Sequence, residues 1–284
     1  MLIQNTRYED LDGKKESSND LSLAKYWASL ADIFINDAFG TLHRAHASNV
    51  GVSSLLPNGI GLLVEKELTN LQMLENPVRP FVVILGGSKV SDKIGVIENL
   101  VTKSDKLLIG GAMAFTFLKA EGKNTASSLI DEENIDFCKK ILTEYKEKII
   151  LPIDGCVSTK LDEETESRNS TFEEMKEEES CFDIGEKTIA LFKKELEHAK
   201  TIFWNGPLGA YEIPKYQKGT KEILEYLTIT NKITILGGGD IASAATNLGY
   251  EDKITYISTG GGATLEYLEG KTLPGISAIE DKTL

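Results

Sequence analysis

The sequence predicts an α/β protein: a doubly wound parallel sheet, with an incomplete second α/β domain joined to it by a long helix. Six short apolar runs of the type that forms buried strands follow residue 80, and helical segments separate most of them. Four of the runs end in glycine, and a fifth continues into Asn205-Gly206-Pro207. The six runs are residues 81–85, 106–109, 148–153, 201–204, 232–236 and 254–258.

Glycine at the strand ends indicates where a ligand binds. In a doubly wound sheet the ligand lies beyond the carboxyl ends of the strands. Because glycine has no Cβ, a phosphate can approach the backbone N–H groups closely at these positions. The pattern therefore favours a large polyanionic ligand along this edge of the sheet.

Length and composition are those of an ordinary globular enzyme. The chain has 284 residues, enough for two domains, and 41% of them are apolar. A net charge of −13 without a basic stripe argues against a nucleic-acid partner. No apolar run is long enough to span a bilayer, so we expect no membrane partner. Three widely spaced cysteines indicate free thiols in a reducing compartment, which predicts a cytoplasmic protein.

The first part of the chain is expected to be a partial domain followed by a connector. Residues 1–58 contain a helix at 22–31 and a strand at 32–36. Since one strand cannot make a sheet, this region lacks the elements of a complete core. An amphipathic helix within 59–77, ended by two prolines, is a candidate interdomain connector.

The second part is expected to be one large domain with a short tail. Residues 78–268 hold all six predicted strands of the sheet. The acidic segment 161–180 is predicted to be a solvated loop with at most one exposed helix. Residues 269–284 are expected to return toward the N-terminal domain.

The turn Gly237-Gly238-Gly239-Asp240 is the first candidate anion site. It follows an apolar strand and precedes an alanine-rich segment that ends at Gly249. The free N–H groups at the start of such a helix point at the turn and bind phosphate. Asp240 is placed to hold a phosphate-bound magnesium. The alternative is an ordinary strand–helix corner.

Two lysines after the first glycine pair strengthen the phosphate interpretation. If a helix starts near Ser88, Lys89 and Lys93 lie four residues apart on one face. Cations at that end oppose the helix dipole and cost about 0.3–1 kcal/mol each, and a bound anion reverses the sign. Surface lysines without a ligand remain the alternative.

Two nucleotide motifs were tested against the sequence. A phosphate-binding G-x-x-x-x-G-K-[ST] loop is absent. Gly237, Gly239 and Ala242 fit the dinucleotide pattern G-x-G-x-x-A, but the spacing to the downstream acids Glu251 and Asp252 is short. An NAD-dependent dehydrogenase is therefore the alternative to a phosphate-transferring enzyme.

Six segments together resemble phosphoglycerate kinase. They occur in the family's order and cover the chain from end to end, so the likeness is specific. The segments are NDAFGTLHRAH (36–46), GGSKVSDK (86–93), WNGPLGAYE (204–212), GGGD (237–240), STGGGA (258–263) and LEGKTLPG (268–275).

This resemblance implies a glycolytic kinase. Such an enzyme moves a phosphoryl group reversibly between 1,3-bisphosphoglycerate with ADP and 3-phosphoglycerate with ATP. The resemblance also implies a monomer with two Rossmann-like domains joined by a long helix. The N-terminal domain takes the phosphoglycerate, and the C-terminal domain takes the nucleotide with Mg²⁺.

The catalytic and phosphate-binding roles are carried over by motif. Lys89 would stabilise the transferring phosphoryl group, and the backbone amides of Gly239 and Gly262 would face it. Lys93 and Asn205 would hold nucleotide phosphates. These roles agree with general chemistry, because phosphoryl transfer depends on positioning and charge neutralisation.

The remaining roles concern the nucleoside, the metal and the second substrate. Glu212 would hold the ribose, and Asp240 the Mg²⁺. Arg7 and Arg44 match the family's phosphoglycerate-binding arginines. The adenine pocket falls at Gly110, Gly111, Leu129 and Phe182, and the other expected nucleotide contacts are Gly87, Pro207, Gly237, Gly238 and Ile241.

The sequence also departs from the family. The opening strands, with an Asp-Phe-Asn stretch and a His-Leu-Gly-Arg-Pro loop, have no counterpart, so Met1 stands well inside the N-terminal domain. Ile241 replaces a hydroxyl residue that contacts phosphate, which costs about 0.5–1.5 kcal/mol of binding. Three hypotheses follow: an active kinase whose remaining part is encoded upstream, a nucleotide-binding fragment without turnover, or the dehydrogenase.

Overall fold

The computed structural model describes residues 2–279, and the chain divides into two compact units. Unit 1 comprises residues 1–72 and 260–284, and unit 2 comprises residues 73–259. No helix in the described part of the chain is long and apolar enough to cross a membrane.

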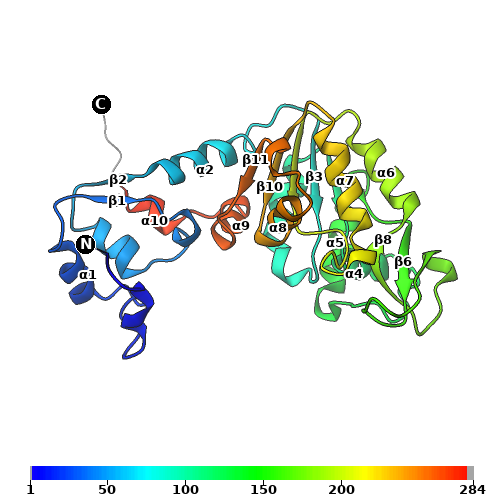
Figure 1. The fold of residues 1–284 in the computed structure, drawn as a ribbon, viewed down its shortest axis with the longest axis horizontal. Helices are drawn as coiled ribbons and strands as arrows, with labels where there is room; N and C mark the ends of the chain where they lie inside the picture. Colours follow the sequence, from blue (N-terminus) through cyan, green and yellow to red (C-terminus); the bar gives the residue numbers. More distant parts are fainter. Residues whose placement is uncertain (1, 280–284) are drawn as a thin grey trace. The chain divides into compact units, whose positions relative to one another are not determined.

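Unit 2 contains the six-stranded parallel sheet that the sequence predicts (Figure 1). The strand order is β11-β10-β9-β3-β4-β5, and every neighbouring pair is parallel. The predicted strand 148–153 is only two residues long, and Pro152, which has no N–H to donate, follows it closely. The strands are β3 (Phe81–Leu85), β4 (Lys106–Ile109), β5 (Ile149–Ile150), β9 (Thr201–Asn205), β10 (Ile233–Gly237) and β11 (Tyr256–Ser258).

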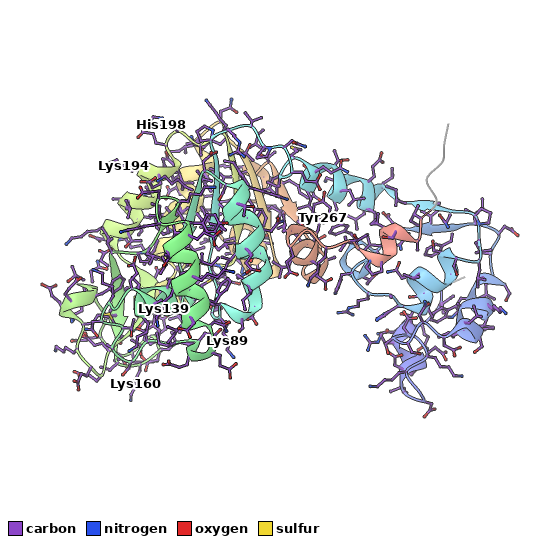
Figure 2. The ribbon with its side chains drawn as sticks, turned by 180° about the vertical axis from the view of Figure 1, so that it is seen from behind. Lys89, Lys139, Lys160, Lys194, His198 and Tyr267 are labelled. Carbon is purple, nitrogen blue, oxygen red and sulfur yellow. The ribbon has the colours of Figure 1, made fainter. Side chains whose placement is uncertain are left out.

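Helices cover both faces of this sheet, as a doubly wound fold requires (Figures 1 and 2). Val82 and Ile84 of β3 pack in one cluster with α6, α7 and α8. Because side chains alternate along a strand, Phe81, Val83 and Leu85 face the other side, and they are fully buried too. The helices of unit 2 are α3 (Ile94–Lys103), α4 (Met113–Ala120), α5 (Ile135–Glu144), α6 (Glu186–Leu196), α7 (Lys218–Thr228) and α8 (Gly239–Asn247).

A second, three-stranded antiparallel sheet corrects the prediction for residues 161–180. Its order is β7-β6-β8, with β6 at Asp154–Ser158, β7 at Arg168–Thr171 and β8 at Ser180–Ile184. The predicted solvated loop is therefore wrong, because the segment contains β7 and buries Phe172 and Met175.

An ion pair explains how so polar a segment is held. The Arg168 guanidinium lies 2.7 Å from the Glu179 carboxylate, which also accepts the Lys176 N–H at 2.9 Å. Glu179 is only 6% exposed, so these bonds satisfy a carboxylate that is nearly out of solvent. The burial of Phe172 and Met175 and the Arg168–Glu179 ion pair thus stabilise a segment whose composition is typical of a loop.

Within residues 2–72 and 260–279, unit 1 has two strands, not the single strand that the sequence predicts. β1 (Phe34–Asn36) pairs in parallel with β2 (Asn58–Ile60), which crosses the boundary that the sequence drew between residue 58 and the connector at 59–77. The connector helix is shorter than expected, α2 spanning Leu62–Gln72. Its first turn is capped by Asp37, whose Oδ1 accepts the N–H of Leu63 at 2.7 Å. The other elements of unit 1 are η1 (Thr6–Asp10), α1 (Leu21–Ala28), η2 (Phe39–Thr41), η3 (Ala47–Gly51), α9 (Gly262–Leu268) and α10 (Pro274–Ser277).

The C-terminal segment is part of unit 1. Gly275 donates its N–H to the Leu42 carbonyl at 2.9 Å, and Ser53 Oγ donates to the Ala278 carbonyl at 2.7 Å. This segment of unit 1 begins at residue 260, whereas the sequence placed the start of the tail at residue 269. α2 also belongs to unit 1, where the sequence drew a separate connector at 59–77.

Replacing Phe192 by alanine should destabilise unit 2 without changing its fold. The ring is fully buried in the cluster between α6, α7 and the sheet, so its removal leaves a cavity and should cost about 3–5 kcal/mol. Urea unfolding followed by circular dichroism measures the loss. Ile229→Ala, at a side chain 79% exposed, is the control and should change stability by less than about 0.5 kcal/mol. Equal losses in both variants would contradict the assigned core.

Candidate functional site

The strand order of the large sheet reverses between β3 and β9, and a cavity lies at the carboxyl ends there. Its volume is about 520 Å³. Of the residues predicted from the sequence, the following line it: Gly87, Gly111, Leu129, Phe182, Pro207, Glu212 and Asp240. The other residues of its wall include Ser88, Ala112, Phe115, Asp154, Asp183, Leu208, Gly209 and Ala210.

The glycines after β3, β4 and β9 build the floor of this site by packing backbone on backbone. A Cβ on Gly206 would lie 2.5 Å from the Gly86 carbonyl oxygen, and one on Gly111 would lie 2.5 Å from the Gly87 nitrogen. Three of the N–H groups are already used: Gly86 donates to Asn205 O at 2.9 Å, Gly87 to Pro207 O at 3.0 Å and Gly111 to Leu208 O at 3.0 Å. Gly86, Gly87 and Gly111 therefore bring the loops together and do not offer free N–H groups to a phosphate.

Lys93 is a buried cation at this edge of the sheet. Its side chain is 9% exposed, and its ammonium donates to the Asn205 side-chain oxygen. Burial lowers the pKa of Lys93 to about 8, although the nearby carboxylates of Asp92 and Asp240 act to raise it. A partly desolvated ammonium held beside a cavity is a strong anchor for an anion.

Lys89 is placed differently from the prediction. The helix does not start near Ser88: a 3-10 turn spans Ser91–Lys93, and α3 begins at Ile94. The two lysines therefore do not share a helical face, because Lys89 lies in the preceding loop, exposed (Figure 2), while Lys93 is buried.

The loop that carries Lys89 is held by Asp131. The Asp131 carboxylate accepts the Ser91 N–H at 2.9 Å and the Asn134 amide at 2.9 Å. Burial acts to raise the pKa of Asp131, but these hydrogen bonds and the charge of Lys89 outweigh it and lower the pKa. Lys89 is thus an exposed cation near the Asp131 carboxylate, on a loop whose backbone Asp131 holds at Ser91.

The Gly237–Asp240 turn leads directly into the uncapped start of α8, as the sequence predicts. Gly238 is the N-cap residue with φ +104°, which glycine adopts readily, and no side chain caps the helix. The Asn205 amide donates to the Gly237 carbonyl, so the residue that holds Lys93 also holds this turn. A Cβ built on Gly239 meets nothing within 4 Å, so its backbone is open to approach.

Ile241 contributes to the core and not to the cavity wall. Its side chain is fully buried among the apolar residues between the sheet and the helices. Any contact with a phosphate would have to come from its backbone N–H in the first turn of α8. Gly110 is likewise below the cavity surface, since a Cβ there would run into Leu208.

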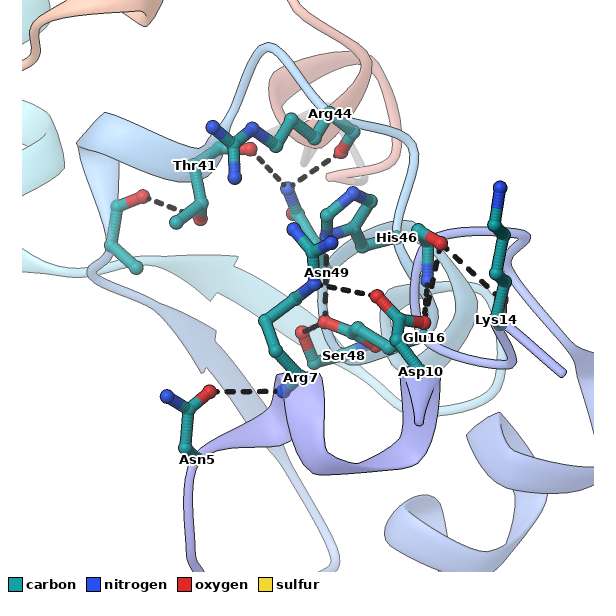
Figure 3. A network of polar contacts seen from close by, with 12 residues as sticks. Asn5, Arg7, Asp10, Lys14, Glu16, Thr41, Arg44, His46, Ser48 and Asn49 are labelled. Atoms are coloured by element: carbon teal, nitrogen blue, oxygen red, sulfur yellow. Dashed lines mark hydrogen bonds and ion pairs between the residues drawn. The ribbon is translucent and has the colours of Figure 1, made fainter. Parts of the chain in front are cut away.

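Arg7 and Arg44 lie in unit 1, in the polar network of Figure 3. Arg7 Nε lies 2.5 Å from Asp10 Oδ2, and Asn5 Oδ1 accepts the Arg7 N–H at 3.0 Å. Arg44 is exposed, and its Nε donates to His43 Nε2 at 3.2 Å. The Asn49 amide holds the Arg44 carbonyl at 3.1 Å. Gly262 is the first residue of α9, also in unit 1.

Two buried carboxylates in the cavity wall were missed from the sequence. Asp154 Oδ1 accepts the Thr188 N–H at 2.7 Å, and its Oδ2 accepts the Lys187 N–H at 3.0 Å, so it caps α6. Asp183 follows Phe182 directly and is 3% exposed. A carboxylate inside a strand that is otherwise buried is the one signal that could have revealed either residue.

Comparisons with known proteins agree on one family. The model of the phosphoglycerate kinase family matches residues 1–271. A phosphoglycerate kinase of Fusobacterium nucleatum is 54% identical over 99% of this chain and 72% of its own length. One of Enterococcus faecalis is 53% identical over the same shares.

Solved structures show the same likeness. The phosphoglycerate kinase of Coxiella burnetii has a TM-score of 0.89 at 39% identity, covering 97% of this chain and 71% of its own. That of Pyrococcus horikoshii has a TM-score of 0.85 at 28% identity, over the same shares. A family match over nearly the whole chain and relatives more than half identical lead to one conclusion: the chain belongs to the phosphoglycerate kinase family.

Proposed function

We propose that unit 2 binds ATP or ADP, with the base in the cavity and the phosphates between Lys93 and the start of α8. Membership of the family makes the chain a glycolytic phosphotransferase that acts on a carboxyl group. The reaction is reversible transfer between 1,3-bisphosphoglycerate with ADP and 3-phosphoglycerate with ATP. The buried Lys93 ammonium is the observation that carries the proposal, because a bound phosphate would stabilise a buried positive charge beside a cavity.

The cavity has walls suited to a nucleoside. Phe182 packs its ring against Tyr216 at a centroid distance of 5.1 Å, which holds it rigid. Leu129, 52% exposed, lies at the rim, and Glu212 offers a carboxylate to ribose hydroxyls. Apolar walls with a few placed polar groups are typical of a nucleotide site.

Phosphates are held by charge and by free backbone donors. Lys93 supplies the charge, and Asn205 fixes the direction of its ammonium. The uncapped first turn of α8, at Gly239, Asp240 and Ile241, supplies N–H groups in the field of the helix dipole. The dinucleotide alternative is not favoured, because the family match accounts for the same glycine turn.

Asp240 fits a magnesium site of the kind that nucleotides bring with them. It lines the cavity as a single carboxylate, and no group of three or more His, Cys, Asp or Glu residues in the described part of the chain could hold a metal alone. Mg²⁺ is usually bound by one or two carboxylates together with substrate phosphates. When bound, it would neutralise phosphate charge during transfer.

The second substrate is assigned to unit 1. Arg44 is exposed and Arg7 half-exposed, and the Nε atoms are the ones paired, with His43 and Asp10, so the terminal nitrogens of both guanidinium groups are proposed to bind a phosphate or carboxylate. Lys89 and the backbone N–H groups of Gly239 and Gly262 would stabilise the phosphoryl group in transfer. We further expect a monomer in the cytoplasm, without nucleic-acid or membrane partners, in keeping with three free cysteines and a net charge of −13.

The affinity for MgADP should fall as the pH rises through about 8. Lys93 has a pKa of about 8, so it loses the charge that binds phosphate over that range. Isothermal titration calorimetry from pH 7 to pH 9.5 measures the change. Lys93→Met should bind weakly at every pH, and a pH slope equal to that of the unaltered chain would contradict the role of Lys93.

Asp240→Asn should weaken binding of the Mg²⁺-bound nucleotide but not of the metal-free nucleotide. It keeps the shape of the side chain but removes its charge, so MgADP affinity should fall by about tenfold or more. Affinity for ADP in the presence of a chelator should change little. A similar loss in both measurements would mean that Asp240 acts on the nucleotide itself.

Lys89→Ala should lower kcat far more than it weakens nucleotide binding. An exposed lysine in a loop is suited to stabilising a charge that develops only in the transition state, so kcat should fall by about 100-fold or more. A coupled assay with 3-phosphoglycerate and ATP measures kcat, and calorimetry measures binding. Lys139→Ala, at another exposed lysine (Figure 2), is the matched control. Equal losses in kcat and affinity would sink the assignment.

A further inference from the structure

Asp183 is a buried carboxylate in the cavity wall to which none of the roles above applies. Its Oδ1 accepts the Ile184 N–H at 2.9 Å, and its Oδ2 accepts the Gly219 N–H at 2.7 Å. Gly219 lies in the first turn of α7, and the N-cap residue Gln217 makes no side-chain cap of its own. Asp183 therefore caps α7 from β8, where a negative charge also meets the helix dipole favourably.

The loop of residues 206–212 contacts the Asp183 carboxylate, β8 and the first turn of α7. A Cβ on Gly209 would overlap the Asp183 carboxylate, so loop and carboxylate are in direct contact. Ala210 donates its N–H to the Phe182 carbonyl at 2.8 Å, which attaches the loop to β8. Leu208 donates its N–H to Thr220 Oγ1 at 3.0 Å, which attaches it to α7. The position of the loop thus depends on how β8 and α7 are joined.

We propose that Asp183 is a positioning residue for nucleotide binding: its ionised carboxylate joins β8 to the first turn of α7 and so fixes the 206–212 loop at the cavity. The inference rests on the proposed function, since this loop carries Pro207 and Glu212 to the cavity wall. Protonation of Asp183 removes one acceptor from this junction, loosens the loop and weakens binding of ADP or ATP.

The environment of Asp183 makes this junction sensitive to pH near neutrality. Burial raises the pKa of Asp183 to about 7, although the hydrogen bonds from Gly219 and Ile184 and the charge of Lys218 act to lower it. The other titratable groups on the elements packed around it include Glu222 of α7, Glu186 of α6, Asp154 and Cys156 of β6, Cys181 of β8, Lys215 of η7 (Pro214–Tyr216), and Tyr211 and Glu212 of the 206–212 loop.

Stability and binding should therefore respond to pH in opposite directions. The ordinary pKa of an aspartate is 3.8, so from about pH 4 to pH 7 the unfolded chain is ionised here while the folded chain keeps the proton. The contribution of Asp183 to stability consequently falls as the pH rises over that range. Its contribution to nucleotide binding should rise over the upper part of the range, as the carboxylate ionises.

Three variants of the whole chain test the proposal by calorimetry with MgADP at pH 6 and pH 8. Asp183→Asn should raise the dissociation constant by about tenfold at pH 8 and much less at pH 6. Gly209→Ala, which keeps the charge but forces the loop away from the carboxylate, should also weaken binding at pH 8. Glu186→Gln is the control: it removes an exposed carboxylate paired with Lys218 at 2.6 Å and should change affinity by less than about twofold.

The decisive quantity is the dissociation constant for MgADP of the variant divided by that of the unaltered chain at the same pH. The titrations of ADP and of Lys93 affect both constants and so cancel in this ratio. The unfolding temperature of Asp183→Asn at pH 8 should be equal to or above that of the unaltered chain. If Asp183→Asn lowers the unfolding temperature and the ratio of dissociation constants is the same at pH 6 and pH 8, Asp183 has a merely structural role and the proposal is overturned.

The variants also distinguish failure of the inference from failure of the proposed function. If the unaltered chain does not bind MgADP, the proposed nucleotide site itself is wrong. If it binds, and both Asp183→Asn and Gly209→Ala bind as tightly at pH 8, Asp183 is not a positioning residue. Should Asp183→Asn not fold, the result for Gly209→Ala decides alone.

Discussion

The edge of unit 2 that we propose to bind nucleotide depends on main chain packed directly against main chain where β3, β4 and β9 end. Hydrogen bonds join the three loops: Gly87 donates to Pro207 O at 3.0 Å, and Gly111 to Leu208 O at 3.0 Å. This close packing brings Asn205 within reach of Lys93 and of the turn before α8. It also lets a lysine stay charged while nearly buried, because the amide oxygen that it needs is held in place.

The large sheet could be predicted because its signal is strong and local. Six apolar runs, five of them followed by glycine or a turn, leave few alternatives to a parallel sheet. The failures have equally local causes. β2 has the sequence Asn-Gly-Ile, which fits the beginning of the amphipathic helix as well as it fits a strand. β7 lies among charges, and its sequence alone does not show its pairing with β6, its ion pair or the burial of Phe172 and Met175 just after it.

Motifs in the sequence name candidate site residues but do not give their geometry. Family motifs named Lys93, Asn205, Glu212 and Asp240, and the structure brings them to one edge of unit 2. Helical spacing wrongly placed Lys89 beside Lys93, because a 3-10 turn before α3 breaks the register. Asp183 could not be found this way, since its partner Gly219 lies 36 residues further along the chain.

The glycine floor has a consequence for how this protein can change. A Cβ on Gly86, Gly111 or Gly206 would meet backbone atoms of a neighbouring loop, not the end of a side chain. A clash with a side chain can be relieved by a second substitution that shortens it, but every amino acid has the same carbonyl group. A substitution at any of these three positions therefore cannot be relieved by a second substitution in the loop that it contacts. The three loops can change only together, with their backbone positions kept.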